Sequence, residues 1–288
     1  MKKKTLLLFG SALLVGLAFA VKSIVFTVPL GPEFIELSKV TPDASLTYQP
    51  DCVQFNSSVP IDRNGQLNVL VWNVYKQQKT DWQAALNTLT TSSDLVLLQE
   101  ASLTPELKQF VMDKSYSAEL VRAFDVFDTS AGVLTLAKKS SEKVCAYTAI
   151  EPWLRLPKSA LLSEYALSNG QTLIVINIHA INFTLGTEDY KNQIEALSQE
   201  VQAHGGPLII AGDFNSWSDD RLATLQQQVK PLRLKEVIFT PDERMRFITG
   251  LPLDHIFYRG LEVKEAHSTK SNASDHNPLQ VSFTLKKQ

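Results

Sequence analysis

The sequence predicts an α/β fold in which β-sheets pack face to face and helices cover them on the outside. Apolar runs of strand length, rich in β-branched residues, alternate with amphipathic segments. The chain has 288 residues, of which 44% are hydrophobic and 20% are charged, so it can bury the core of one large domain. Several long strands combined with three or more helices are typical of such a layered sandwich.

Residues 1–22 are predicted to be a signal peptide or a membrane anchor. Lysines at positions 2–4 precede an apolar stretch over residues 6–21. Ala-Phe-Ala at 18–20 fits a cleavage site, and the stretch is somewhat short for a full membrane span. However, the hydrophobicity continues over residues 24–30, which a cleaved signal peptide would not need and which is compatible with retention as an anchor. Both interpretations stay open.

The leader favours a periplasmic, secreted or inner-membrane-anchored protein over a cytoplasmic one, with membrane association through residues 5–30. Residues 23–66 are predicted to be an arm or tether, because they are rich in Pro, Ser, Asp and Asn without sustained periodicity. Cys52 and Cys145 either pair in an oxidising compartment or remain free, and their spacing does not decide.

The large domain is expected over residues 67–288, and its elements follow in order. The strand patterns cover residues 67–72, 94–99, 131–138, 160–167, 173–178, 207–212, 254–258, 261–266 and 279–285. The helical patterns cover residues 80–91, 104–114 and 187–204, and residues 216–222 suggest a further helix. Thr104 and Pro105 fit the N-cap and first turn of the second helix.

Polar side chains able to bind a metal or a phosphate stand at the ends of the long strands. In chain order these are Asn73, Glu100, His179, Asp213 and Asp254. Because side chains alternate along an extended chain, Asp213 and Asn215 point the same way while Phe214 points back toward the core. A carboxylate and an amide therefore share one surface.

Oxygen ligands of this kind suit Mg²⁺, Mn²⁺ or Ca²⁺ rather than zinc. Glu100 and Asp275 are the candidate carboxylate ligands, and Asp213, Asn215 and His276 could activate water and stabilise the charge that develops on a phosphodiester. The residues thus indicate a metal-dependent phosphoesterase.

Simpler interpretations exist for these residues. Asp213 and Asn215 could cap the helix that follows, and Asp275 before Pro278 could form a turn. His179 could be a satisfied group at the rim of the core. The remaining histidines are interpreted as structural or solvated: His204, His255 and His267.

The charge balance argues against nonspecific binding of duplex DNA. The formal net charge is −2, and without the four lysines of residues 1–22 the remaining 24 basic and 30 acidic side chains give −6. Neutralisation of phosphates normally requires a basic surface. Local patches at Arg155 and Lys158, or at Arg244 and Arg246, are more simply solvated side chains. No serine-hydrolase elbow, P-loop, dinucleotide fingerprint or zinc spacing occurs.

The order of these motifs resembles the endonuclease/exonuclease/phosphatase superfamily. Within it, Trp72-Asn73-Val74-Tyr75-Lys76 and Gly212-Asp213-Phe214-Asn215 are most similar to an uncharacterised bacterial branch, the YafD-like proteins. The resemblance implies a four-layer α-β-β-α sandwich of two mixed sheets flanked by helices, with residues 67–288 as the catalytic domain. It also implies Mg²⁺, or alternatively Mn²⁺, as the cofactor.

Residue by residue, the resemblance implies a metal site and a catalytic set. Glu100 resembles the main metal ligand, with Asn73 beside it and Asp275 as the second carboxylate. The implied catalytic roles are water activation by Asp213, phosphate binding by Asn215, contact with the scissile phosphate by His276, orientation of that imidazole by Asp254, and leaving-group protonation by His179.

The substrate implied is a phosphate ester, either a nucleic acid, a nucleotide or a phospholipid head group, acted on by a monomer. Fold alone does not choose among these substrates. An alternative hypothesis is a catalytically weak, membrane-tethered binding protein that retains the fold. The complete carboxylate set argues against it.

Overall fold

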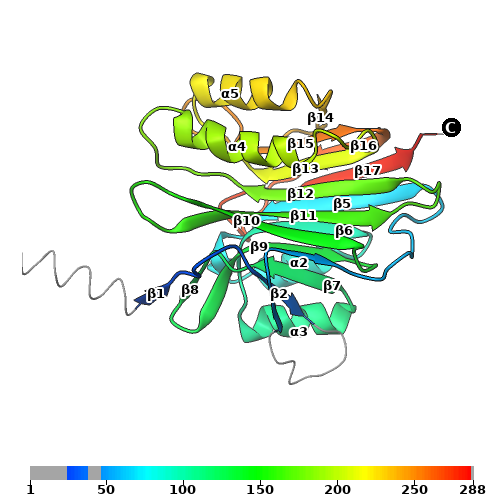
Figure 1. Cartoon of the computed structure of the whole chain (residues 1–288), viewed down its shortest axis with the longest axis horizontal. Coiled ribbons are helices and arrows are strands. Elements are labelled where there is room, and N and C mark those ends of the chain that lie inside the picture. Colours follow the sequence, from blue (N-terminus) through cyan, green and yellow to red (C-terminus); the bar gives the residue numbers. More distant parts are fainter. Residues whose placement is uncertain (1–24, 38–46, 287–288) are drawn as a thin grey trace, which may run out of the picture.

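The computed structural model describes residues 25–37 and 47–286. Over these residues the chain forms two mixed β-sheets packed face to face, with helices on both outer sides (Figure 1). This is the predicted α-β-β-α sandwich. The predicted leader, residues 1–22, lies outside the described residues. Within them, no helix has both the length and the apolar character needed to cross a membrane.

The first sheet joins segments from both ends of the described chain. Its spatial order is β16 (Leu261–Ser268), β17 (Leu279–Leu285), β5 (Gln66–Asn73), β6 (Leu95–Ser102), β9 (Thr129–Ala137), β7 (Ser117–Val121), β2 (Phe34–Leu37) and β3 (Thr47–Gln49), with β8 (Phe124–Val126) on β9 and β1 (Phe26–Thr27) on β8. Strands β5 and β6 run parallel, and the other pairs are antiparallel.

The second sheet carries the middle of the chain. Its spatial order is β14 (Lys235–Glu236), β15 (Asp254–Arg259), β13 (Leu208–Asp213), β12 (Thr172–His179), β11 (Pro157–Ala166), β10 (Lys143–Ile150) and β4 (Cys52–Gln54). Strands β12 and β13 run parallel, whereas their neighbours are antiparallel.

Helices cover the outer face of each sheet. The outer core of the first sheet includes residues of α2 (Trp82–Leu89) and α3 (Pro105–Lys114). The outer core of the second includes residues of α4 (Glu188–Glu200) and α5 (Asp219–Val229). Figure 1 shows these two helix layers on opposite sides of the sheets. A short 3₁₀ turn, η1 (Tyr75–Gln77), follows β5.

Side-chain alternation divides the apolar residues between the inner and outer cores. In β13, Ile209 and Ala211 enter the core between the sheets, while Leu208 and Ile210 pack toward α4 and α5. The inner set in β12 includes Val175, and continuing the same alternation carries position 179 to the inner face. The polar residues at the strand ends therefore open onto one end of the space between the sheets.

The predicted helix starts agree closely with the structure, and several strands were not predicted. Thr104 accepts a hydrogen bond from the Leu107 N–H at 3.3 Å, with Pro105 at the first helical position. The helix after residue 216 begins at Asp219, and the Oγ of Ser218 caps it. The unpredicted strands include β7, β8 and β10, which have short or mixed apolar patterns.

Part of the segment expected to be an arm pairs with the sheets. Strand β2 pairs with β7, and β4 pairs with β10. A disulfide joins Cys52 in β4 to Cys145 in β10, which resolves the alternative left open by the sequence. The described part of residues 23–66 is thus built into the domain, while the predicted boundary at residue 66 stays a prediction.

Candidate active site

His179, Asp213 and Asp254 lie side by side on three neighbouring strands. In the register of the second sheet, His179 at the end of β12 pairs with Asp213 at the end of β13, and Asp213 pairs with Asp254 at the start of β15. All three side chains are buried. The Nε2 of His179 lies 3.5 Å from the Oδ2 of Asp213. Strand pairing alone therefore aligns these groups at one edge.

Gly212 lets β13 approach β12 at this edge. Its φ is +142°, and a Cβ at this position would lie only 2.0 Å from the carbonyl oxygen of Ile178. A side chain would force the two strands apart just before Asp213. Glycine at position 212 thus holds Asp213 against β12.

Asn73 brings the first sheet to the same carboxylate. At the end of β5, its Nδ2 donates a hydrogen bond to the Oδ2 of Asp213 at 3.0 Å. Its Oδ1 accepts a hydrogen bond from the Tyr75 N–H at 3.0 Å, which fixes the orientation of the amide. Asp213 is therefore contacted from both sheets.

Glu100 reaches the site through a bulge in β6. Along this strand Leu97 faces the inner core and Leu98 faces the helices, so simple alternation would turn Glu100 toward the helices as well. The pairing with β9 instead shifts between Leu98 and Ala101, and Glu100 has a left-handed φ of +52°. The bulge redirects Glu100, whose Oε1 lies 3.7 Å from the Nε2 of His179.

A strained turn places Lys76 against Glu100. Tyr75, Lys76 and Gln77 have φ values of +49°, +51° and +55°, a left-handed conformation that side chains rarely adopt. The Gln77 side chain holds the turn by bonding the N–H and the carbonyl of Ser102, each at 3.0 Å. The Nζ of Lys76 forms an ion pair with the Oε2 of Glu100.

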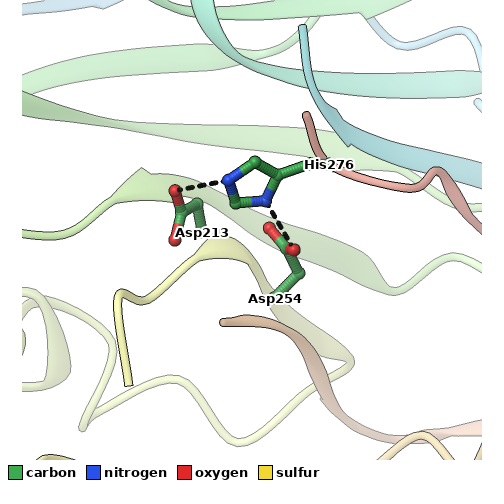
Figure 2. Close-up of side chains that lie close together, drawn as sticks. All are labelled: Asp213, Asp254 and His276. Atoms are coloured by element: carbon green, nitrogen blue, oxygen red, sulfur yellow. Dashed lines mark hydrogen bonds and ion pairs between the residues drawn. The ribbon is translucent and has the colours of Figure 1, made fainter. Parts of the chain in front are cut away.

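His276 bridges two buried carboxylates (Figure 2). Its Nδ1 lies 2.7 Å from the Oδ2 of Asp254, and its Nε2 lies 3.8 Å from the Oδ2 of Asp213. Burial would lower the pKa of His276, but Asp254 and Asp213 outweigh it and raise the pKa to about 10. At neutral pH this side chain is an imidazolium that donates a hydrogen bond from Nδ1 to Asp254 and forms an ion pair with Asp213.

The loop between β16 and β17 holds His276 in place. The Oγ of Ser274 donates to the carbonyl oxygen of Asn73 at 2.6 Å, and the indole of Trp72 donates to the carbonyl oxygen of His276 at 2.9 Å. Asp275 between them is exposed, and its Oδ1 lies 3.3 Å from the Oγ of Ser274. Asp275 is thus beside the site but open to solvent.

His179 is a neutral imidazole beside a lysine. The Nζ of Lys158 on β11 lies 3.0 Å from its Nε2. Burial and the charge of Lys158 lower the pKa of His179 to about 4, against the opposing effect of Asp213 and Glu100. The ammonium of Lys158 therefore donates to Nε2.

Asn215 is locked beside Asp213 by main-chain and arginine contacts. Its N–H donates to the Oδ1 of Asp213 at 2.9 Å, and its Nδ2 donates to the Ala180 carbonyl oxygen at 2.9 Å. Arg221, 1% exposed, donates from Nε to the Asn215 carbonyl oxygen at 2.7 Å. Asp213 and Asn215 thus do not cap α5, because Ser218 has that role.

The residues around Glu100 fit a hard divalent cation. Burial would raise the pKa of Glu100, but His179, Lys76 and Lys158 lower it to about 2, so the carboxylate is ionised at neutral pH. Its side chain is 18% exposed, and the amide oxygen of Asn73 is a further oxygen donor at the end of the neighbouring strand. Oxygen donors of this kind suit Mg²⁺.

A second group of possible ligands exists. Asp213, Asp254 and His276 offer ligand atoms that all lie within 4.8 Å of one another, so these residues could also hold an ion. However, the imidazolium of His276 carries a proton on both ring nitrogens, and a protonated nitrogen has no lone pair for a metal. The oxygen donors around Glu100 therefore fit a divalent metal ion better than the group of Asp213, Asp254 and His276 does.

The structure gathers the residues singled out in the sequence and adds four more. Asn73, His179, Asp213, Asn215, Asp254 and His276 are joined by direct contacts, and Glu100 contacts His179. Of the four added residues, Trp72 and Lys76 belonged to the motif that carries the resemblance but had no assigned role. Arg221 was not predicted, and Lys158 was assigned only to a solvated patch. His255, interpreted as structural, is buried between the Oγ of Ser216 at 2.8 Å and Glu236 at 2.7 Å.

The fold and this group of side chains define a class. Two mixed sheets with carboxylate, amide and imidazole groups at one end form the α/β sandwich expected for phosphoesterases. The sequence profile of the Endonuclease/Exonuclease/phosphatase family matches residues 70–276. The chain belongs to this family, whose members are phosphoester hydrolases.

Relatives extend over nearly the whole chain. A UPF0294 protein of Vibrio parahaemolyticus is 50% identical over 262 residues, which cover 91% of this chain and 92% of the relative. A UPF0294 protein of Klebsiella pneumoniae is 42% identical over 230 residues, covering 80% and 86%. These UPF0294 relatives confirm the predicted YafD-like bacterial branch.

Solved structures share the fold at low identity. An endonuclease/exonuclease/phosphatase from Beutenbergia cavernae superimposes with a TM-score of 0.60 and 15% identity, covering 76% of this chain and 72% of that one. D. rerio TDP2 complexed with single strand DNA product gives a TM-score of 0.54 at 18% identity, covering 76% and 99%. These similarities establish the architecture.

Proposed function

We propose that the protein is a Mg²⁺-dependent phosphodiesterase that uses a water molecule as the nucleophile. The observation that carries this proposal is the environment of Asp213. This buried carboxylate accepts a hydrogen bond from Asn73 and lies 3.5 Å from His179 and 3.8 Å from His276. A single base flanked by polar groups from both sheets is suited to deprotonating an attacking water.

His276 and Asn215 would bind the phosphate. Because Asp254 holds the imidazolium through Nδ1, Nε2 is the atom free to turn toward a phosphate oxygen. A fixed positive charge in a buried site stabilises the negative charge that develops during attack. Asn215, locked by Asp213 and Ala180, would place its amide group beside the same phosphate.

Glu100, with Asn73 and Asp275, would hold the metal ion, with Mn²⁺ as the alternative to Mg²⁺. When bound, the ion supplies Lewis-acid stabilisation of the phosphoryl oxygens. The depressed pKa of Glu100 supports this role, since the carboxylate keeps its charge at any physiological pH. Lys76 would give up its ion pair with Glu100 when the ion binds.

Protonation of the leaving oxygen is assigned to His179 together with Lys158. The neutral imidazole cannot itself donate from Nε2, but the ammonium of Lys158 lies 3.0 Å from that atom. A proton passed from Lys158 to His179 and on to the leaving oxygen would restore the role that the sequence assigned to His179 alone.

A substrate panel tests the proposal. Purified protein is assayed with an aryl phosphodiester, a single-stranded oligonucleotide, a nucleotide and a phospholipid, each with and without Mg²⁺ or Mn²⁺. We expect metal-dependent hydrolysis of at least one diester, reduced at least about 100-fold by Asp213→Asn. Turnover that is equal in the Asp213→Asn variant would reject the assignment, and absence of turnover on every substrate would favour the binding-protein alternative.

A further inference from the structure

Large apolar side chains are exposed on three loops at the active-site end of the sheets. These loops lead into Lys158 on β11, out of His179 on β12 and into Asp254 on β15. We call them the apolar rim, and its exposed members are Ile150, Trp153, Leu154, Phe183, Leu185, Met245, Phe247 and Ile248. The exposed fractions of Leu185 and Ile248 reach 81% and 93%.

Direct contacts join the three loops into one surface. Buried Glu151 in the first loop accepts hydrogen bonds from the N–H groups of Asn182 and Phe183 at 2.9 and 3.0 Å. The indole of Trp217 donates to the side chain of Asn182 at 2.9 Å, and its ring lies 5.8 Å from that of Phe247. The exposed apolar groups therefore belong to a continuous, ordered rim.

The tips of the loops that carry the apolar rim hold few charges. The loop over residues 180–187 contains no charged residue, and Glu151 is buried. The loop over residues 150–157 carries the exposed Arg155. The loop over residues 237–253 carries Asp242, Glu243, Arg244 and Arg246, and both of its arginines pair with Asp242. Aromatic and aliphatic groups accompanied by arginine are the composition of protein surfaces that lie in a bilayer interface. A contiguous exposed apolar patch beside an active site marks a binding surface.

The start of the described chain lies at this same end. Strand β1 pairs with β8, and the exposed Phe127 in the turn after β8 donates its N–H to the Val25 carbonyl oxygen at 2.7 Å. Phe124 of β8 lines the small pocket that also contains Lys158 and His179. The described chain therefore starts, at Val25, beside the active site.

We propose that the apolar rim docks the active site onto a lipid bilayer, so that the substrate is the phosphoester head group of a membrane lipid. This proposal rests on the proposed phosphodiesterase function and specifies its substrate class. A leader held in the bilayer and an apolar rim at the same end would together turn the site toward the membrane surface.

Fluorescent probes on the full chain test the docking. Both native cysteines are disulfide-bonded, so a cysteine that replaces Trp153 can be labelled alone with an environment-sensitive fluorophore. Val59→Cys is the matched control: Val59 is 52% exposed, against 60% for Trp153. It precedes Ile61, which bonds Ala166 at the opposite end of β11.

We expect the probe at position 153 to shift to shorter wavelength and to be quenched by brominated lipids in phosphatidylglycerol-containing vesicles. The probe at position 59 should do neither, even though the leader attaches both proteins to the vesicle. Equal behaviour of the two probes would overturn the proposal. So would a shift at position 153 without vesicles, which would indicate that residues 1–24 or a second copy cover the rim.

An activity measurement separates docking from chemistry. The double variant Trp153→Ser with Leu154→Ser should hydrolyse vesicle phospholipid at least about 10-fold more slowly, because it loses buried apolar area at the interface. Its rate on a soluble aryl phosphodiester should equal that of the wild type. Unchanged hydrolysis of vesicle lipid would overturn the docking proposal. Failure of the wild type to hydrolyse the soluble diester would instead reject the phosphodiesterase function. The fluorescence of the probe would still test docking independently of activity.

Discussion

Asp213 owes its position to contacts at the level of single residues. Asn73 and the Asn215 N–H each donate to one of its oxygens, at 3.0 and 2.9 Å. His276 and His179 lie on either side, one with a raised pKa and the other with a lowered pKa. At neutral pH His276 is therefore charged and His179 is neutral. The two imidazoles beside Asp213 can thus have different roles at the same pH.

The paired roles of Lys158 and His179 predict a dependence on the leaving group. His179→Ala and Lys158→Met should each slow hydrolysis of an alkyl or nucleoside diester by about 100-fold, because these leaving groups require a proton. On an activated aryl diester both variants should stay close to the wild-type rate, whereas Asp213→Asn should lose activity on both substrates.

Steady-state rates on the two substrate types provide this comparison. Arg155→Met is the matched control for Lys158→Met, since this exposed side chain lies in the loop that leads into β11 and has no assigned role in proton transfer. Equal losses on both substrates would place His179 and Lys158 in phosphate binding rather than in leaving-group protonation.

His276 predicts how stability depends on pH. Its pKa rises from about 6.5 in the unfolded chain to about 10 in the folded protein. Its contribution to stability is therefore complete below about pH 6.5 and is lost as the pH rises through about 10. The free energy of unfolding, measured by urea titration between pH 6 and 10, should fall with pH. The fall should be smaller in Asp254→Asn, and identical slopes would show that the imidazolium does not depend on Asp254.

The polar residues at strand ends could be predicted, but their cationic neighbours could not. Asp213 and Asn73 follow continuous apolar strands, so alternation alone places them. Lys76 contacts Glu100 because residues 75–77 are all in the left-handed conformation. None of these three residues is a glycine or an asparagine, so the sequence does not indicate that conformation. Lys158 meets His179 because β11 pairs antiparallel with β12, a register that depends on the assembled sheet.

At the level of elements, irregularities in the strands orient the side chains of the candidate active site. The bulge in β6 turns Glu100 away from the helix side. The sequence pattern correctly ended the apolar run at residue 99 but missed that the strand continues to Ser102. A bulge is decided by pairing with the neighbouring strand, so a single strand's pattern does not contain it.

Gly212 provides a test of strand approach. Gly212→Ala should destabilise the protein by about 2 kcal/mol or more, because its Cβ would overlap the Ile178 carbonyl oxygen. It should also lower phosphodiester hydrolysis by displacing Asp213. The control Gly205→Ala meets no atom within 4 Å and should leave both properties unchanged. Chemical denaturation and turnover of the two variants provide the test. A stable, fully active Gly212→Ala protein would show that the close approach of β12 and β13 does not require glycine at position 212.

The disulfide predicts a stabilising link between the amino-terminal segment and the second sheet. It closes a loop of 93 residues between β4 and β10. Replacing both cysteines by serine should lower the free energy of unfolding by about 3 kcal/mol. Thermal melts of the wild type with and without reductant provide the same comparison without mutation. If neither the serine replacements nor the reductant changed the melting temperature, the disulfide would contribute nothing to stability.

At the scale of the whole molecule, a fully buried polar pair joins the two sheets across their apolar core. The Nε2 of Gln99 in the first sheet donates to the Oδ1 of Asn177 in the second at 2.7 Å, and both side chains are fully buried. Asn177 also donates to the carbonyl oxygens of Leu98 and Leu134. These bonds lie one or two residues behind Glu100 and His179, so they fix the relation between the two halves of the site.

The architecture was the most predictable level of the molecule. Apolar periodicity gave the main strands and helices, and the order of motifs indicated the family and its layers. The amino-terminal strands could not be predicted, because β2 and β4 are short and are defined by pairing with β7 and β10. The meeting of three apolar loops at the rim likewise follows from the assembled fold.

The most direct test of the central claim is hydrolysis of a soluble aryl phosphodiester as a function of Mg²⁺ concentration in wild type and Glu100→Gln. We expect chelator-treated wild type to be inactive and Mg²⁺ to restore its activity. We expect Glu100→Gln, folded to the same extent by circular dichroism, to lose activity at least about 100-fold and to require more metal, because an amide lacks the carboxylate's charge. Full activity after removal of divalent metal, or an unaffected Glu100→Gln variant, would contradict the central claim.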